Sequence, residues 1–310
     1  MAGPLEGIRV VDLTQVVSGP LATMLLADQG AEVVKVEPLG IGGDVTRLPS
    51  YAKAGISALF VNNNRGKRSL ALDLTKEEGK QIVIDLVEQA DVFIQNFRPG
   101  AIERLGLSYE ELKAVNPKLI YCSISGFGPD GPYSDRPVLD PVIQGLTGMV
   151  SRQLNPQIPF PDLVRNLVAD KSTAFTSAQA ITAALFSRER TGEGQFLEIP
   201  MLDSCLYFFW VDGMMDLTML DEDVSPGITL AKVYNITNTS DGQLIYFAAN
   251  DKQRFGLLRA LGRDELCEDE RFSSLAAISN PENFAALGEI VAKEFEKVTN
   301  DEIIPKLIEH

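Results

Sequence analysis

Short apolar, β-branched runs alternate with helix-like segments through the first two hundred residues, and this alternation constrains the fold more than any other feature of the sequence. The runs predicted to be buried strands are residues 7–14, 31–36, 68–74, 91–97, 118–125 and 195–202. A capping box, Thr75-Lys76-Glu77-Glu78, predicts the start of an amphipathic helix through Ala90. Because strands joined by helical crossovers form a parallel sheet covered on both faces, the sequence predicts an α/β fold, Rossmann-like in outline.

The pattern changes toward the C-terminus and predicts a second domain. Residues 206–219 form a strongly apolar helix, interpreted as buried core, with the lining of an apolar acyl site as the alternative. Asp241-Gly242 separates two apolar runs and predicts a hairpin, followed by helices over 251–261 and 280–298. We therefore expect a large domain over 1–200, a linker helix over 201–224 and a smaller α+β domain over 225–310.

Charge and histidine content exclude several classes of function. The chain has 43 acidic and 28 basic residues, a net charge of −15, so we expect it to bind neither nucleic acid nor an anionic membrane. The single histidine is His310, which argues against Ser-His-Asp and Cys-His catalysis and against ordinary histidine–metal sites, and no metal is predicted. Three scattered cysteines, an N-terminus unlike a signal peptide and the lack of a bilayer-length apolar run predict a cytoplasmic protein.

One glycine motif matches a nucleotide-binding pattern but lacks its structural context. Residues 126–131 (GFGPDG) fit G-x-G-x-x-G directly after a predicted strand. The dinucleotide fingerprint needs a helix N-terminus immediately afterwards, whereas Pro129 and Pro132 remove backbone donors there. We predict a mobile glycine- and proline-rich loop instead.

Basic residues cluster at two strand ends in this otherwise acidic chain. Residues 64–68 (NRGKR) form one cluster, and Arg98 with Arg104 forms another after the strand over 91–97. Ligands bind at the carboxyl ends of strands in open α/β sheets, and guanidinium groups suit phosphate. Phe97 could pack an adenine ring beside them. Exposed surface charges are the alternative interpretation.

Asp170 stands between an apolar run and a helix of small residues predicted over 171–190. The plain interpretation is an N-cap aspartate. The functional one is a nucleophile, because a helix N-terminus keeps a carboxylate ionised and fixes its direction. The two interpretations are compatible, and the residues alone leave both open.

Several segments, in the same order and at the same spacing, resemble the family III CoA-transferases, which include the formyl-CoA and carnitine CoA-transferases. The resemblance runs through at least the first two hundred residues. Its segments are LEGIRVVDLTQVVSGPLATMLLADQGAEVVKVEP, NNNRGKRSLALDL, ADVFIQNFRPGAIERLG, NPKLIYCSISGFGPDGPY, LVADKSTA and ERTGEGQFLEIPMLDS. It implies coenzyme A as a substrate, in the form of an acyl-CoA, and a ring-shaped subunit interlocked in a homodimer.

The resemblance also implies a set of site residues. Asp170 corresponds to the catalytic aspartate, and Asp140 would lie near the reacting thioester. The other residues of the implied CoA site are Val17, Ser18, Leu72, Asn96, Phe97, Arg98 and Arg104. A position that supplies a basic contact to CoA in some members is Pro38 here, and the glycine-rich loop of some formyl-CoA transferases is not evident. Both departures bear on substrate identity.

The implied reaction proceeds through an aspartyl–acyl anhydride and an aspartyl-CoA thioester, without ATP or metal. Backbone N–H groups at the start of the helix and in the loop of Gly128 and Gly131 are candidate oxyanion donors.

Two alternatives remain at this level. The related α-methylacyl-CoA racemases use a histidine shortly before the helix that is expected to begin at Asp140, where this chain reads Pro137-Val138-Leu139. The second alternative is a catalytically silent CoA-binding protein, because the sequence ends in a helical pattern without a C-cap and family members run longer. We therefore expect a C-terminal return segment to be lacking. The acyl donor and the acceptor acid are not readable from the sequence.

Overall fold

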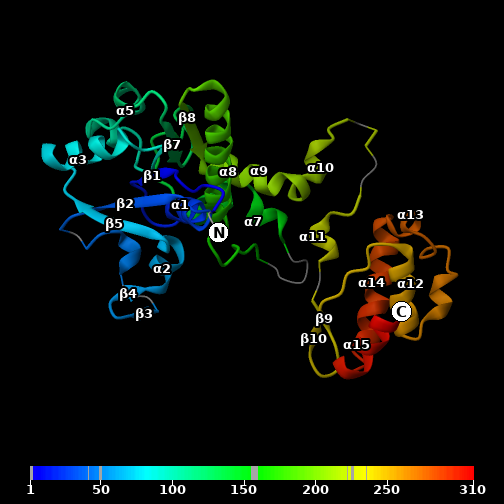
Figure 1. Ribbon diagram of the computed structural model, residues 1–310. Coiled ribbons are helices and arrows are strands. Elements are labelled where there is room, and N and C mark those ends of the chain that lie inside the picture. Colours follow the sequence, from blue (N-terminus) through cyan, green and yellow to red (C-terminus); the bar gives the residue numbers. More distant parts are fainter. Residues whose placement is uncertain are drawn as a thin grey trace. The chain divides into compact units, whose positions relative to one another are not determined.

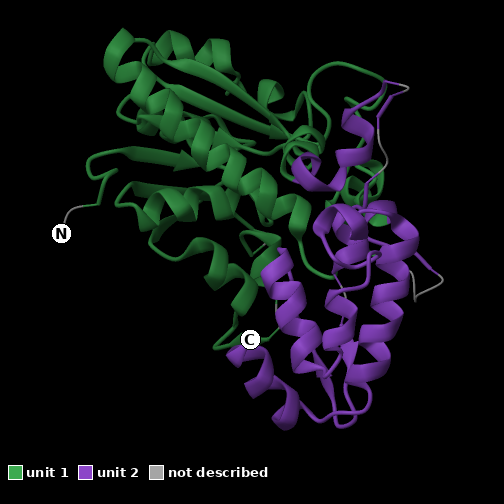
Figure 2. Ribbon diagram, turned by 90° about the vertical axis from the view of Figure 1, so that its right-hand side faces the viewer, with its two compact units in different colours: residues 1–150, 163–208 green, residues 151–162, 209–310 purple. Residues whose placement is uncertain are grey.

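The computed structural model describes residues 3–40, 42–48, 51–154, 160–221, 223–224, 227–234 and 236–310. The chain groups into two compact units: unit 1 is residues 1–150 with 163–208, and unit 2 is residues 151–162 with 209–310 (Figure 2). The division falls inside helix α9 (Met201–Gly213). The domain boundaries inferred from the sequence, at 200 and 225, stay a prediction.

Unit 1 is built on a parallel sheet of six strands (Figure 1). The strands are β1 (Arg9–Asp12), β2 (Glu32–Pro38), β5 (Lys67–Leu72), β6 (Val92–Gln95), β7 (Ile120–Ser125) and β8 (Gln195–Pro200). Their order across the sheet is β5-β2-β1-β6-β7-β8, with every neighbouring pair parallel. Counted along the chain this is the 3-2-1-4-5-6 order of doubly wound folds, so the α/β prediction is confirmed.

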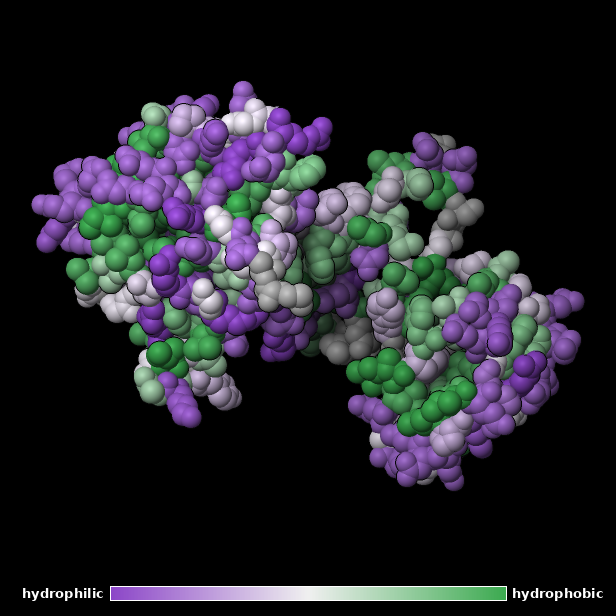
Figure 3. Space-filling view, viewed as in Figure 1, coloured by the Kyte–Doolittle hydropathy of each residue, from purple (hydrophilic) through white to green (hydrophobic). Residues whose placement is uncertain are grey.

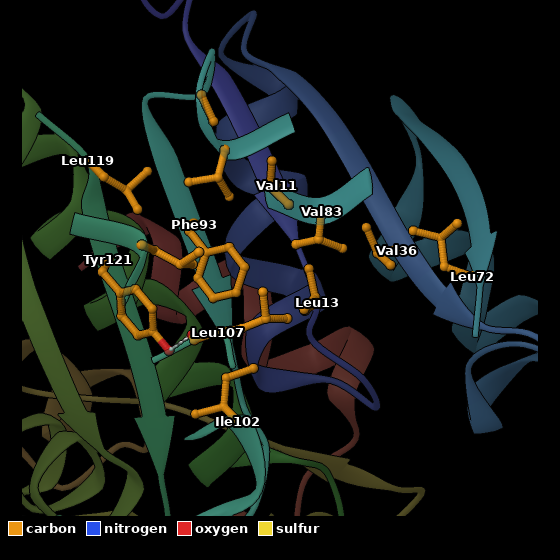
Figure 4. Packing of buried hydrophobic residues seen from close by; sticks show 13 residues of the cluster. Val11, Leu13, Val36, Leu72, Val83, Phe93, Ile102, Leu107, Leu119 and Tyr121 are labelled. Carbon is orange, nitrogen blue, oxygen red and sulfur yellow. Dashed lines mark hydrogen bonds between the residues drawn. The ribbon is translucent and has the colours of Figure 1, made fainter. Parts of the chain in front are cut away.

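Helices cover both faces of this sheet because alternate residues of each strand point to opposite sides. On one face, α3 (Glu77–Val87), α4 (Ala101–Arg104) and α5 (Tyr109–Val115) pack onto a buried apolar cluster (Figure 4). Phe93 and Tyr121 lie at its centre with ring centroids 4.9 Å apart, and the Tyr121 hydroxyl donates to the Leu107 carbonyl (3.1 Å). On the other face lie α1 (Ser18–Asp28) and α8 (Val168–Thr191).

The remaining elements of the chain are short or belong to unit 2. Near the N-terminal half they are η1 (Val45–Arg47), β3 (Ala52–Lys53), β4 (Ile56–Ser57), α2 (Ala58–Asn64), α6 (Asp140–Leu146) and α7 (Met149–Arg152). Later elements are α10 (Met215–Thr218), α11 (Leu230–Val233), β9 (Thr237–Asn238), β10 (Gln243–Leu244), α12 (Asp251–Ala260), η2 (Asp264–Cys267), α13 (Leu275–Ile278), α14 (Pro281–Phe295) and α15 (Asn300–Glu309). Among the described residues, no helix has both the length and the apolar character needed to cross a membrane.

The elements predicted for the C-terminal part are largely confirmed. β9 and β10 pair antiparallel across the Asp241-Gly242 turn, although the strands are shorter than predicted and residue 235 lies outside the described residues. α12 and α14 match the predicted helices, and the Asn280 side chain caps α14 by accepting from the backbone N–H groups of residues 282 and 283. Their apolar faces form the core of unit 2 with α15.

Two local predictions are wrong. Thr75 does not cap α3: the N-cap is Lys76, and the Thr75 hydroxyl donates instead to the carboxylate of Asp73. The apolar stretch 206–219 is not mainly core, because Tyr207 and Val211 of α9 are 79% and 82% exposed. Hydrophobic residues interrupt the hydrophilic surface of both units in Figure 3. The apolar composition of α9 therefore does not reflect burial within this chain.

Two buried ion pairs underlie the loop that follows β1. Lys35 Nζ lies 3.0 Å from Asp44 Oδ2 and donates to the Thr14 carbonyl (2.6 Å). Lys67 Nζ lies 3.1 Å from Asp12 Oδ2. Burial opposes ionisation of Asp12, but Lys67 and Lys35, with hydrogen bonds from the Thr14 and Thr23 hydroxyls, hold the pKa of this carboxyl below its usual value.

The substitution Lys35→Met should cost about 3–5 kcal/mol of unfolding free energy, because it leaves the buried Asp44 carboxylate without its cation. Arg65→Met is the matched control: it removes the exposed Arg65–Asp28 pair and should cost less than about 1 kcal/mol. Urea unfolding of both variants measures the two values. Equal losses would contradict a structural role for the buried pair.

Candidate functional site

A cavity of about 530 Å³ opens at the carboxyl edge of the sheet in unit 1. Its lining comes from the segments that follow β1 and β6, from the end of β7 and the loop after it, and from the helices α1, α6, α8 and α9. The lining residues are Val16, Ser18, Asn96, Phe97, Arg98, Pro99, Ile124, Ser125, Gly126, Arg136, Pro137, Val138, Leu139, Val142, Asp170 and Met201. β1 and β6 are neighbours whose chain connections leave in opposite directions, so this edge is the topological switch point. Ligands of doubly wound sheets bind there.

Asp170 is the one carboxylate among the described residues that line this cavity. It occupies the third position of α8 rather than the cap, because the N-cap is Leu167 and makes no side-chain cap. The prediction of an N-cap aspartate is therefore wrong by three residues, although Asp170 still lies in the first turn, where the helix dipole favours a negative charge. Its side chain is only 8% exposed.

A second buried carboxylate fixes the backbone at Asp170. The Asp170 N–H donates to Asp140 Oδ2 (2.9 Å), and Gln144 Nε2 donates to Asp140 Oδ1 (2.6 Å). The Gln144 Oε1 accepts from the Val164 N–H (2.9 Å). Gln144 and Asp140 are 1% and 3% exposed, so α6 and the chain leading into α8 are joined by a buried polar network.

Burial and Asp140 together raise the pKa of the Asp170 carboxyl from 3.8 to about 6. Burial contributes most, since it penalises the ionised form, and the nearby Asp140 adds like-charge repulsion. Ser18 acts in the opposite sense, because its hydroxyl and backbone N–H both donate to the carboxylate. Ser18 is the first residue of α1, so the N-termini of α1 and α8 converge on the same group.

The loop between β1 and α1 is held in a strained conformation that presents Ser18. Val16 has φ +70°, a region that β-branched residues rarely adopt. Its N–H donates to Asp44 Oδ1 (3.3 Å), the carboxylate that pairs with Lys35. The Asn96 side chain accepts from the Gln15 N–H (2.9 Å) and donates to the Gln15 carbonyl (2.8 Å), which links the loops after β1 and β6.

The residues expected at the CoA site divide into two groups. Ser18, Asn96, Phe97 and Arg98 line the cavity together with Asp170. The others do not line it: Val17 and Leu72 are buried, Asp140 lies behind Asp170, and Arg104 is exposed on α4.

Pro38 pairs with Leu72 across β2 and β5 beside a smaller hollow of about 250 Å³. The nearby Arg47 binds Glu37 through Nε and Nη2 (both 2.6 Å) and stacks on Phe60, so its guanidinium is already engaged.

The glycine-rich segment is a loop, as predicted, but it does not supply the expected donors. The Gly128 N–H donates to the Ser125 hydroxyl (3.0 Å), and neither Gly128 nor Gly131 lines the cavity. Gly126 does line it, and a side chain there would overlap Val138, since an added Cβ would lie 2.3 Å from Val138 Cγ1. The oxyanion role expected for the Gly128 N–H is therefore not supported.

Val16, Arg136 and Gln144 shape the site and were not among the residues predicted for it. The positive φ of Val16 and the burial of Gln144 depend on tertiary contacts, so no sequence pattern predicts them. Arg136 had a weak signal, since it is the basic residue of the Pro-rich loop before Asp140.

The substitution Asp170→Asn should stabilise the protein at pH 8 and hardly at all at pH 4. A carboxyl whose pKa rises from 3.8 to about 6 on folding lowers stability as pH rises through that window, by up to about 3 kcal/mol above it. Asparagine removes this cost, while its amide oxygen still accepts from Ser18. Urea unfolding at both pH values tests this, with the gain expected to shrink below about 1 kcal/mol at pH 4. The same gain at both pH values would contradict the raised pKa.

Comparison with known proteins identifies the family. The profile described as CoA-transferase family III matches residues 5–310. A succinate–glutarate CoA-transferase from Agrobacterium fabrum is 39% identical over 87% of this chain and 70% of its own length. An acetyl-CoA:oxalate CoA-transferase from Acetobacter aceti is 34% identical over the same shares of the two chains.

A solved structure agrees with these sequence matches. A CaiB/BaiF family protein from Brucella suis is 36% identical, with a TM-score of 0.82, and the match covers 100% of this chain and 82% of that one. The family profile matches nearly the whole chain, and the relatives that are more than 30% identical to it are CoA-transferases by name. The chain belongs to the family III CoA-transferases.

Proposed function

We propose that this enzyme moves coenzyme A from an acyl-CoA to a free carboxylic acid through covalent intermediates on Asp170. The observation that carries the proposal is a buried carboxylate with a raised pKa, at the first turn of α8, which lines a cavity at the switch point of the sheet. The names of two relatives, which pair succinate with glutarate and acetyl-CoA with oxalate, support a free acid as acceptor.

In the first half-reaction the Asp170 carboxylate attacks the acyl-CoA carbonyl. The C–S bond breaks, and an aspartyl–acyl anhydride and CoA thiolate form. The thiolate then attacks the Asp170 carbonyl carbon, which forms an aspartyl-CoA thioester and releases the first acid as a carboxylate. The second acid repeats these steps in reverse and leaves as the new acyl-CoA. No proton or external oxidant is consumed, so the energy of the thioester is conserved throughout.

The environment of Asp170 suits a nucleophile. With a pKa of about 6 the carboxyl is mostly ionised near pH 7, yet it is more basic than an ordinary aspartate and so a better nucleophile. Asp140 and Gln144 hold the backbone of Asp170, and Ser18 directs its carboxylate oxygens. The Ser18 donors oppose the effect of burial and lower the pKa of the Asp170 carboxyl.

The CoA moiety is assigned to the loop after β6. Arg98 is exposed beside Phe97 in the lining of the cavity, where a guanidinium and a ring suit a phosphate and an adenine. Val17 and Leu72 are buried and do not line the cavity, so this proposal gives neither a direct contact with CoA. Arg104, exposed on α4, adds a cation outside the cavity.

The racemase alternative lacks a second base. Asp170 is the only residue among the described lining that exchanges protons near neutral pH, and Asp140 is engaged by Gln144 and the Asp170 N–H. Exchange of an α-proton between two faces of a carbon needs two bases. The cavity therefore favours transfer.

The substitution Asp170→Asn should lower CoA transfer by roughly 10⁴-fold or more, because it removes the nucleophile. Asp203→Asn is the matched control: Asp203 is an exposed carboxylate in the first turn of α9 and should keep full activity. Transfer is followed by chromatography of the acyl-CoA formed from an acyl-CoA and a labelled acid. Substantial transfer by folded Asp170→Asn protein would contradict the proposal.

A homodimer is part of the proposed assembly. Tyr207 and Val211 of α9 and Phe186 of α8 are each more than two-thirds exposed, and large exposed apolar groups mark interaction surfaces. We expect the protein to sediment at twice its monomer mass, and the variant with Tyr207→Lys and Val211→Lys to sediment as a monomer. Ile82→Lys, an exposed apolar site on α3, is the control. Sedimentation of the wild type as a monomer would contradict the assignment.

A further inference from the structure

Among the described residues that line the cavity with Asp170, two are arginines, and only one has an assigned role. Arg98 follows β6 and is placed with CoA. Arg136 lies in the loop between β7 and α6, four positions before Asp140. No part of CoA has been assigned to Arg136, so its position in the lining leaves it available to another ligand.

Arg136 is held in place by an aromatic ring rather than by an acid. Its guanidinium carbon lies 4.2 Å from the centroid of the Tyr133 ring, and Tyr133 packs edge-to-face on Phe127 with centroids 5.5 Å apart. The Arg136 N–H donates to the Tyr133 carbonyl (2.9 Å), which closes the turn beneath this stack. Stacking on a ring leaves the edge of the guanidinium fork available to a planar anion.

In the part of the chain that the structure describes, no carboxylate forms an ion pair with Arg136, although the protein carries a net charge of −15. Four other described arginines of the sheet unit form ion pairs with acidic residues, as Arg188 does with Asp91 (2.8 Å). An unpaired cation in the lining of a cavity of an acidic protein attracts an anionic substrate. A carboxylate matches its fork in a bidentate arrangement.

The chain between Arg136 and Asp140 limits how far Arg136 can lie from the reacting carboxylate. Three residues separate Arg136 from Asp140, so the Cα atoms of the two lie at most about 14 Å apart. Asp140 touches the Asp170 backbone. The residues between the two charges, Pro137, Val138 and Leu139, line the cavity with apolar groups. A cation, an apolar stretch and a reactive carboxylate thus follow one another along the lining.

We propose that Arg136 binds the free carboxylate of a dicarboxylic acid whose other carboxylate reacts at Asp170, with a short methylene chain lying on Pro137, Val138 and Leu139. The substrate class is thus a short aliphatic diacid and its mono-CoA thioester. This inference rests on the proposed transfer at Asp170. It makes Arg136 a residue of substrate specificity and gives it no part in bond making.

The test compares glutarate with pentanoate, which has the same carbon chain and one carboxylate fewer. Wild-type protein should use glutarate with a kcat/KM about 10- to 100-fold higher, the usual effect of a hydrogen-bonded charge pair. Arg136→Gln should abolish this preference by lowering kcat/KM for glutarate alone, with pentanoate and the KM for the acyl-CoA donor unchanged. Arg190→Gln is the control, because Arg190 also stacks on a ring, Phe186, and lies outside the cavity lining.

Two results would overturn the assignment. Equal losses for glutarate and pentanoate, with a raised KM for the donor, would place a CoA phosphate on Arg136 instead. Wild-type protein that does not prefer the diacid would also refute it. Calorimetric binding of glutarate and pentanoate needs no turnover: if Arg136→Gln removes a preference for glutarate in binding while no transfer occurs, the role of Arg136 stands and the proposed function falls.

Discussion

The candidate site depends on one interaction, the hydrogen bond from the Asp170 N–H to the buried carboxylate of Asp140. It fixes the first turn of α8 against α6 and places a second negative charge near the proposed nucleophile. That charge, together with burial, raises the pKa of Asp170 to about 6. Gln144 stabilises the buried Asp140 carboxylate by donating a hydrogen bond to its other oxygen. Gln144 also accepts from the Val164 N–H, which links Asp140 to the chain before α8. Position and reactivity of Asp170 therefore have a common origin.

The loop between β1 and α1, which presents Ser18 to the site, is held by a buried ion pair. Lys35 and Asp44 form a buried pair behind β1, and Asp44 accepts the N–H of the strained Val16. The strain turns the loop so that Ser18 meets Asp170 from the N-terminus of α1. Strained residues persist where surrounding contacts over-determine them, and they concentrate at functional sites. The buried pairs Lys35–Asp44 and Lys67–Asp12 provide such contacts behind the loop. Burying these charged groups costs stability that well-packed apolar residues would not cost.

The sheet and its connections were predictable because apolar runs of strand length, separated by helices, allow few arrangements. All six strands of the unit 1 sheet overlap predicted runs, although β2 extends two residues and β5 one residue beyond them. Tertiary contacts that leave no periodic signal were not predictable. Examples are the engagement of Gln144 with Asp140, the positive φ of Val16, and the use of the Gly128 N–H by Ser125. Tyr207 and Val211 show the converse, because apolar composition suggested burial where the chain leaves them exposed.

The central claim is that Asp170 carries CoA as a covalent thioester. The most direct measurement is the intact mass of the protein after brief exposure to an acyl-CoA, with wild type beside Asp170→Asn. The account predicts a CoA-sized mass increase on the wild type alone, mapped to the peptide that contains Asp170 and discharged by a free carboxylic acid. A folded wild-type protein that binds the acyl-CoA and turns it over without this adduct, or an adduct that persists in Asp170→Asn, would contradict it.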